Sequence, residues 1–426
     1  MPGRAKFLTA RPLPHACNSI AQVGGGAVLK LPLTKLPGWP GTLRENRTMT
    51  DVERILTLWR ELEAASADYV LATVVEVQGS SYRKPGALML LAPDGRRAGT
   101  VSGGCLESQV AQRAWWLTAD GPTIQRYSTA EEDGELPYGS GCGGVIFLLL
   151  ERRATANPLL IELEQAFKQR LPLAIATILE GPHLGRRAFA KPSSPTSLPG
   201  ELHDLATDAL EQSTSIDRVI SMDGVDLRAW GNFRPARPGL CIFGAGDDAQ
   251  PLLHLARELG WFVSVADGRS HLVTRERFPS ADAVHLLSPA DPSADTESQP
   301  FTILRPHDAA VIMTHSFQQD AQILTTLLAL DIPIAYIGVL GPQRRTRELL
   351  AESARQQHPT SASAADAQID RWLGRLHAPM GLDLGADSPA TIALSVVSEI
   401  QKSLTASSAL PLREVRARSN AVTIPR

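Results

Sequence analysis

Residues 239–249 read Gly-Leu-Cys-Ile-Phe-Gly-Ala-Gly-Asp-Asp-Ala, a short apolar run followed at once by a glycine-rich turn. The run predicts a buried strand, and the turn from Gly244 to Ala249 matches the pattern G-x-G-x-x-G/A that opens a helix. This combination is typical of the first strand, loop and helix of a Rossmann fold. Cys241 lies inside the apolar run, so we expect it to be an ordinary core residue.

Alternating strand and helix patterns continue downstream of this turn. The sequence predicts strands at 240–243, 261–266, 309–314 and 334–339, and helices at 249–259, 318–330 and 344–354. Strands that alternate with helices in this way indicate a doubly wound α/β domain with a parallel sheet. A polar loop is expected at 356–367.

Candidate ligand-binding residues in this half lie where the strands end, because open α/β sheets bind ligands at the carboxyl ends of their strands. Asp267 follows the glycine turn by the ~20 residues at which an acid bonds a ribose hydroxyl, whereas Asp247 and Asp248 place negative charge where a pyrophosphate would bind. Arg344 and Arg345 at a helix start are suited to an anionic group, although a solvated helix face is an equal alternative. The candidates are Gly244, Gly246, Asp267, His315, Gly338, Gly341, Arg344 and, in a loop rich in proline and glycine, His377.

The upstream half predicts a mixed α+β domain. Thr50 and Glu53 have the spacing of a capping box and precede a helix with one apolar face. A β-branched run at 69–77, a hairpin at 87–101, a helix at 107–117 and a buried strand at 145–150 follow. Residues 181–238 are rich in proline, serine and charge, and some strands are expected there, such as one at 218–221.

These patterns predict a domain organisation in five parts. The expected parts are a disordered extension or mis-assigned start at 1–48, an α+β domain at 49–233, a linker at 234–238, a Rossmann-like domain at 239–404 and a disordered tail at 405–426.

Two of the four cysteines lie in short glycine-flanked segments: Ser102-Gly103-Gly104-Cys105-Leu106-Glu107 and Gly141-Cys142-Gly143-Gly144. Glycine leaves a thiol uncovered, and successive amides in such a loop form a concavity that favours thiolate. Cys105 also precedes a predicted helix, whose N-terminus lowers the pKa of a nearby thiol. Turn cysteines without chemistry are the alternative interpretation.

Composition limits the possible classes of protein. The chain has 426 residues and a formal net charge of −3. This slightly acidic balance does not suggest nucleic-acid binding. No apolar stretch approaches the length of a membrane span. Four widely spaced cysteines do not form a disulfide framework, so we expect a cytoplasmic protein.

Several ordered motifs together resemble the XdhC/CoxI family, over roughly residues 53–150 and 239–402. The motifs that carry the resemblance are Gln78-Gly79-Ser80-Ser81-Tyr82-Arg83, the two cysteine segments, Gly244-Ala245-Gly246, Met313-Thr314-His315, Gly338-Val339-Leu340-Gly341 and His377-Ala378-Pro379-Met380-Gly381-Leu382. Family members are accessory factors for the maturation of molybdenum hydroxylases such as xanthine dehydrogenase.

The resemblance implies a non-catalytic chaperone that binds molybdenum cofactor, supports its sulfuration and delivers it to a hydroxylase apoenzyme, together with a cysteine desulfurase. It implies that Cys105 and Cys142 are the sulfur-reactive or molybdenum-proximal thiolates, a role that suits a soft ligand. It further implies that the pterin phosphate is held by Ser80, Ser81, Arg83 and the backbone around Ser102, Gly103, Gly104, Gly141, Gly143 and Gly144. A homodimer is expected because it is the commonest oligomer.

The chain departs from the family pattern in its second half. Relatives commonly have histidine where Asp247 stands, and Asp-His where this chain has Ser316-Phe317. Two alternatives therefore stay open: an NAD(P)-dependent oxidoreductase that uses the Rossmann-like loop, with His315 or His377 as its acid–base residue, and a persulfide carrier that binds no pterin.

Overall fold

The computed structural model of the protein describes residues 50–104, 106–128, 144–192, 200–287, 300–357 and 362–415. The first described element is helix α1, Asp51–Ala64, and it begins as the sequence predicts. The Thr50 hydroxyl accepts from the Glu53 amide, and the Glu53 carboxylate accepts from the Thr50 amide. Both donors would otherwise be unsatisfied at the helix N-terminus.

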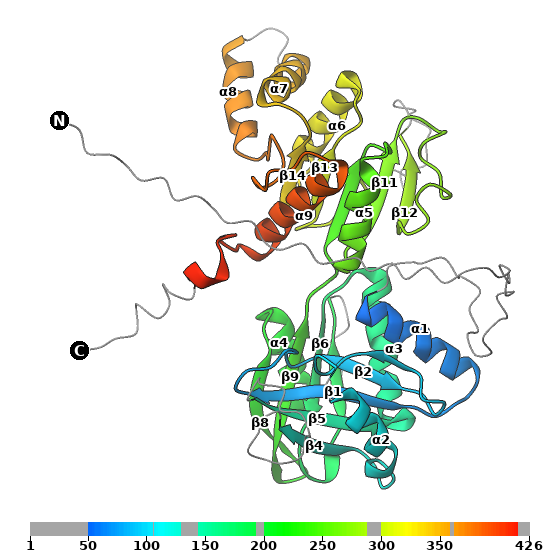
Figure 1. Ribbon diagram of the computed structural model, residues 1–426. Coiled ribbons are helices and arrows are strands. Elements are labelled where there is room, and N and C mark those ends of the chain that lie inside the picture. The colour runs from blue at the N-terminus through cyan, green and yellow to red at the C-terminus, as the bar shows by residue number, and fades with distance from the viewer. Residues whose placement is uncertain are drawn as a thin grey trace, which may run out of the picture. The chain divides into compact units, whose positions relative to one another are not determined.

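An antiparallel sheet of five strands forms the first layer, in the order β3-β2-β1-β5-β4. Its strands are β1 (Val70–Gln78), β2 (Leu88–Leu91), β3 (Arg97–Gly99), β4 (Thr123–Ser128) and β5 (Val145–Arg152). Helices α1 and α3 (Arg153–Gln169) cover one face, while α2 (Glu107–Leu117) covers the other (Figure 1). Strands β1, β2 and β5 are mostly apolar on both sides, as expected where both faces of a sheet are covered.

A second antiparallel sheet follows, in the order β7-β6-β9-β8. It contains β6 (Leu173–Ile178), β7 (Arg187–Ala190), β8 (Ile216–Met222) and β9 (Val225–Arg234), and α4 (Glu201–Glu211) packs on it. The sequence did not predict α4, although Leu202, Leu205 and Ala209 mark its buried side. A small cluster that includes Leu149 and Trp230 joins the two antiparallel sheets.

The predicted Rossmann-like domain is confirmed in the second half. Its parallel strands are β10 (Gly239–Phe243), β11 (Phe262–Asp267), β12 (Ala283–Leu286), β13 (Ala309–Ile312) and β14 (Tyr336–Val339). Their order, β12-β11-β10-β13-β14, corresponds to 3-2-1-4-5 and reverses direction beside β10, as in Rossmann folds. Cys241 lies in the central strand β10 and is buried, as predicted.

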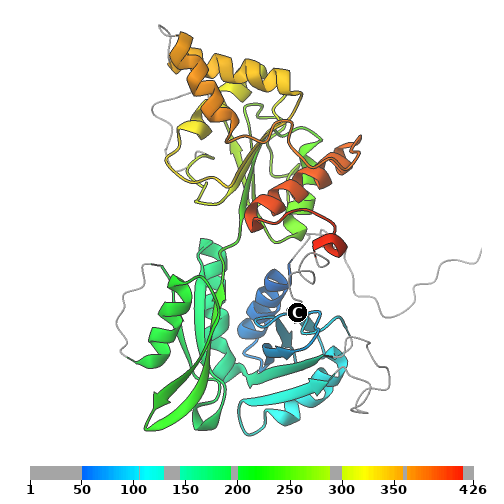
Figure 2. The ribbon, with the colours of Figure 1, turned by 90° about the vertical axis from the view of Figure 1, so that its left-hand side faces the viewer.

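Helices cover both faces of this parallel sheet, as Figures 1 and 2 show. One face carries α5 (Ala249–Glu258) and α9 (Pro389–Thr405), and the other carries α6 (Phe317–Ala329), α7 (Gln343–Gln357) and α8 (Ala362–Leu373). The expected loop at 356–367 is therefore wrong from Ala362 onward, where α8 begins. Among the described residues, no helix combines the length and hydrophobicity needed to span a membrane.

Candidate functional site

A serine–glutamate pair fixes the loop that carries Cys105. Glu107 is the first residue of α2, and its Oε1 accepts from the Val101 and Ser102 amides at 3.2 and 2.8 Å. Its Oε2 accepts the Ser102 hydroxyl proton at 2.6 Å. The same hydroxyl oxygen accepts from the Gly104 and Leu106 amides at 3.2 and 3.1 Å. One serine side chain therefore organises the backbone on both sides of Cys105.

This arrangement also sets the charge of Glu107. Burial alone would raise the pKa of its carboxyl group, but hydrogen bonds from the Ser102 hydroxyl and from backbone amides outweigh burial and leave the pKa lowered. Glu107 is 1% exposed and stays ionised at neutral pH. The loop is thus held from the inside by a buried carboxylate.

One described glycine from each cysteine segment, Gly103 and Gly144, lies against the loop that follows β1. A methyl group built on Gly144, the last residue of the Cys142 segment, would overlap the carbonyl oxygen of Ser80. A methyl group built on Gly103 would lie 3.7 Å from Cγ of Tyr82. The structure therefore brings Ser80, Tyr82, Gly103 and Gly144 together, although more than 60 positions separate the first from the last (144 − 80 = 64).

The side chains of the loop after β1 differ in their surroundings. Tyr82 is 75% exposed, unusually open for an aromatic residue. The Ser81 hydroxyl is buried and has no partner within the described ranges. Arg83 donates to the Asp51 carboxylate at 2.8 Å, so its charge is already paired. Ser102, Gly103 and Gly104 complete this surface.

Cys105, Gly141, Cys142 and Gly143 lie outside the described residues, so their role remains a prediction. Within the described ranges, no group of three or more His, Cys, Asp or Glu residues is arranged to hold a metal ion. Burial raises the pKa of the Cys241 thiol to about 12, which makes this cysteine unreactive at neutral pH.

The glycines of the turn after β10 lie in close contact with other residues of the protein. Gly244 has a φ of +131°, and a methyl group on it would overlap the Met313 backbone after β13. A methyl group on Gly246 would lie 2.6 Å from Asp248 Oδ1. The first glycine therefore permits two strand ends to approach, and the second leaves space for an aspartate beside the N-terminus of α5.

Asp267 ends β11 as predicted, but protein donors occupy both of its oxygens. Oδ2 accepts from the Ala245 amide at 2.7 Å, and the Arg269 guanidinium binds both oxygens at 2.9 and 2.7 Å. Burial opposes ionisation, yet these bonds keep the pKa of Asp267 lowered. A ribose hydroxyl would have to displace Arg269, which disfavours the nicotinamide-dependent alternative.

A cavity of about 270 Å³ lies at the carboxyl ends of β13 and β14, lined in part by His315, Asp320, Gly341 and Arg345. His315 has a φ of +63°, and its Nε2 lies 3.1 Å from Asp248 Oδ2. Arg345 donates to buried Asp320 at 2.7 Å. The predicted Arg344 instead is exposed and pairs with Glu348 along α7. Arg345, one position further, is the arginine of this cavity.

His377 belongs to a different cluster. Its Nδ1 lies 3.0 Å from Glu399 Oε1 on α9, and its ring stacks on Tyr336 at 4.2 Å between centroids. Glu399 also accepts from the Tyr336 hydroxyl and the Gly381 amide. A methyl group on Gly338 would lie 2.6 Å from the Tyr336 ring, so this glycine serves packing. His377 pairs with Gly338 in the carboxyl half of β14, yet none of His377, Tyr336 and Glu399 lines the 270 Å³ cavity.

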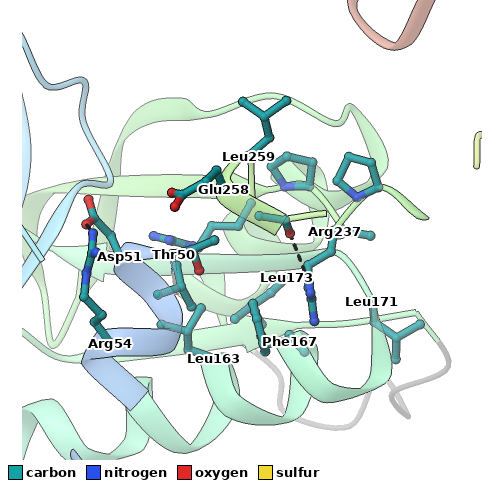
Figure 3. Close-up of a pocket in the computed structure, with 17 residues that line it drawn as sticks. Thr50, Asp51, Arg54, Leu163, Phe167, Leu171, Leu173, Arg237, Glu258 and Leu259 are labelled. Carbon is teal, nitrogen blue, oxygen red and sulfur yellow. Dashed lines mark hydrogen bonds and ion pairs between the residues drawn. The ribbon is translucent and has the colours of Figure 1, made fainter. Parts of the chain in front are cut away.

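A second cavity, of about 490 Å³, contains none of the residues that the sequence singled out as a site (Figure 3). Leu163 and Phe167 of α3 form an apolar wall, and the Arg237 guanidinium lies 4.1 Å from the centroid of the Phe167 ring. Arg237 also donates to the Gly260 carbonyl at 3.2 Å, as the dashed line in Figure 3 marks. No Cys, His, Ser, Lys or Tyr is among the described residues that line this cavity.

Comparison with known proteins decides the family. Residues 240–400 match the profile described as XdhC Rossmann domain, and residues 62–128 match the XdhC and CoxI family. A probable xanthine dehydrogenase subunit of Bacillus subtilis is 33% identical over 337 residues, which cover 78% of this chain and 92% of the relative. The chain belongs to the XdhC and CoxI family. The predicted resemblance is thereby confirmed.

Two further relatives agree with this assignment. The molybdenum cofactor insertion chaperone PaoD of Escherichia coli is 26% identical over 366 residues, covering 84% of this chain and 90% of PaoD. A crystal structure described as a xanthine dehydrogenase from Bacillus halodurans superposes with a TM-score of 0.63 at 28% identity, covering 85% of this chain and 97% of that one. The stretch that matches the XdhC and CoxI profile includes both Ser80–Arg83 and Ser102–Glu107.

Proposed function

We propose that this XdhC and CoxI family member is a molybdenum cofactor insertion chaperone that serves a molybdenum hydroxylase. The names of its relatives support this class of function. The observation that carries the proposal is the convergence of the loop after β1 with the two cysteine segments, through Ser80 with Gly144 and Tyr82 with Gly103.

The described residues of this surface suit the proposed cargo. Molybdenum prefers soft ligands, which Cys105 and Cys142 supply by their chemistry. Ser81 offers a buried hydroxyl without a partner in the described part of the chain, and Tyr82 offers an exposed aromatic face to a planar ring system. The Ser102–Glu107 pair keeps the Cys105 loop in shape before the cargo arrives, which reduces the ordering cost of binding.

The finer steps are part of the same proposal. The chaperone receives sulfur for its cargo from a cysteine desulfurase, shields the cargo and hands it to the hydroxylase apoenzyme, and it acts as a homodimer. The Rossmann-like domain serves docking rather than hydride transfer, because the Arg269 guanidinium already binds both carboxylate oxygens of Asp267. Titration with NAD and NADP tests this last point, and a clear thermal shift with either nucleotide would contradict it.

The central experiment measures anaerobic binding of molybdenum cofactor, read as bound molybdenum and bound pterin. Wild type should bind stoichiometrically, and Cys105→Ser and Cys142→Ser should lose binding. Cys17→Ser is the matched control, because Cys17 lies in neither glycine-flanked segment. Wild-type protein that binds neither molybdenum nor pterin would refute the proposal.

A further inference from the structure

Arg234, the last residue of β9, is a cation without a carboxylate partner in the described ranges. Its guanidinium donates to the Gly86 carbonyl oxygen at 2.8 Å, and it forms no ion pair within those ranges. Burial lowers its pKa to about 10. By contrast, Arg187 on β7 and Arg228 on β9 of the same sheet pair with Glu151 and Glu76. A partly buried charge left unbalanced is costly, and this makes Arg234 a candidate for binding an anion.

Arg234 opens into a cavity of about 330 Å³, bounded by the start of α1, the segment from Tyr82 to Leu88 and the end of β9. Three cations line it, namely Arg83, Lys84 and Arg234, against one carboxylate, Asp51. That carboxylate is already bound by Arg83 at 2.8 Å and by Arg54 at 2.6 Å. The positive charges of Lys84 and Arg234 are therefore unbalanced within the described part of the wall.

The same cavity is continuous with the candidate site through one residue. Tyr82 lines the cavity, and its side chain also lies beside Gly103 in the Cys105 segment. A ligand anchored near Arg234 and extended along Tyr82 would therefore reach the loop of Cys105.

We propose that this cavity binds the phosphate monoester group of an anionic ligand, with Arg234 and Lys84 as the contacting residues. The inference rests on the proposed function, because it names where the phosphate of the cargo is held. A guanidinium offers a planar fork that matches phosphate oxygens, and an ammonium adds a point charge. Two unbalanced cations match a phosphate dianion, whereas a carboxylate would neutralise only one of them.

The test uses calorimetric titration of the full chain with glycerol 2-phosphate and, in parallel arms, with acetate and AMP. Wild type should bind glycerol 2-phosphate at least tenfold more tightly than acetate. Arg234→Gln should weaken phosphate binding at least tenfold and Lys84→Gln severalfold. Arg97→Gln, an exposed arginine on β3 outside the cavity, is the matched control and should bind as wild type does. Tighter binding of AMP than of glycerol 2-phosphate would support the site and identify a nucleotide as its source of phosphate.

The inference is wrong if wild type does not bind glycerol 2-phosphate. It is also wrong if Arg234→Gln and Lys84→Gln both bind glycerol 2-phosphate as tightly as wild type does. Lys84 is exposed, so its variant remains informative if Arg234→Gln does not fold. Loading of molybdenum cofactor separates this result from the proposed function. Undiminished cofactor loading by Arg234→Gln would refute the phosphate site alone. Phosphate binding that depends on Arg234, without any cofactor loading by wild type, would support the anion site and refute the chaperone.

Discussion

Replacing Glu107 with glutamine should damage the Cys105 loop, although the two side chains have almost the same shape. The Ser102 hydroxyl has two lone pairs and one proton. The Gly104 and Leu106 amides occupy the lone pairs, and Glu107 Oε2 accepts the proton. Glutamine presents an NH₂ group at that position, so the hydroxyl would face a third donor and its own proton would lose its acceptor.

The magnitude follows from the bonds that change. The Ser102 hydroxyl loses a bond to a charged acceptor, and the Val101 and Ser102 amides exchange a charged acceptor for a neutral one. Hydrogen bonds to charged groups contribute about 1.5–3 kcal/mol and neutral ones about 1 kcal/mol. We therefore expect Glu107→Gln to reduce the free energy of unfolding by about 2–4 kcal/mol.

Urea unfolding at pH 7 measures this loss, and hydrogen exchange of the Gly104 and Leu106 amides shows whether it is local. Glu61→Gln is the matched control, because Glu61 is an exposed carboxylate on α1 that pairs with Arg96 and should contribute less than about 1 kcal/mol. If Glu107→Gln is no more destabilising than Glu61→Gln, or if both amides keep their wild-type protection, the argument about the serine hydroxyl is wrong.

Three further predictions concern stability. Arg187→Gln leaves the fully buried Glu151 carboxylate without its guanidinium and should cost about 3–5 kcal/mol in urea unfolding, whereas a loss below 1 kcal/mol would contradict a role for the pair. Gly144→Ala should destabilise the protein by about 1–3 kcal/mol because its methyl group overlaps the Ser80 carbonyl, and Gly95→Ala, a turn glycine at φ +86° with open space around it, should cost only about 1 kcal/mol. Glu107, Asp267 and Glu399 have pKa values lowered by hydrogen bonds despite burial, so the stability they contribute is present above their unfolded values of 4.5, 3.8 and 4.5 and is lost as pH falls through the folded values. Thermal unfolding should therefore be steady down to about pH 5 and fall steeply below pH 4, and a steep loss between pH 8 and 6 would count against these carboxylates.

Local patterns predicted most elements, because apolar periodicity and capping residues act over a few positions. The Thr50 capping box and the strand before Gly244 are examples, and both are confirmed. Helix α4 differs from the sequence expectation: Leu202, Leu205 and Ala209 have helical spacing, but the proline- and serine-rich segment before them favours a loop. Its periodicity was a usable signal.

The details of the sites depend on contacts that the sequence does not display. Adjacent residues on a helix point about 100° apart, so Arg344 and Arg345 cannot both face Asp320. Packing of Leu349 and Leu350 sets the rotation of α7, and with that rotation Arg345 reaches Asp320. Likewise, Arg234 is distinctive for the absence of a carboxylate partner in the described ranges, and ion pairs join residues far apart in sequence. Neither the rotation of α7 nor the missing carboxylate partner of Arg234 can be derived from local sequence patterns.

The glycines of the cysteine segments serve two different purposes, and this difference gives the candidate site an inner and an outer side. Gly144 is required because the Ser80 backbone lies against it. Gly104, with a φ of +112°, has no described atom within 4 Å of a methyl group built on it, so no packing contact in those ranges requires its small size. Its left-handed conformation instead lets the chain turn while its amide stays bonded to Ser102. The loop is therefore supported from within by Ser102 and Glu107 and exposed at Gly103 and Gly104, where the proposed cargo would approach.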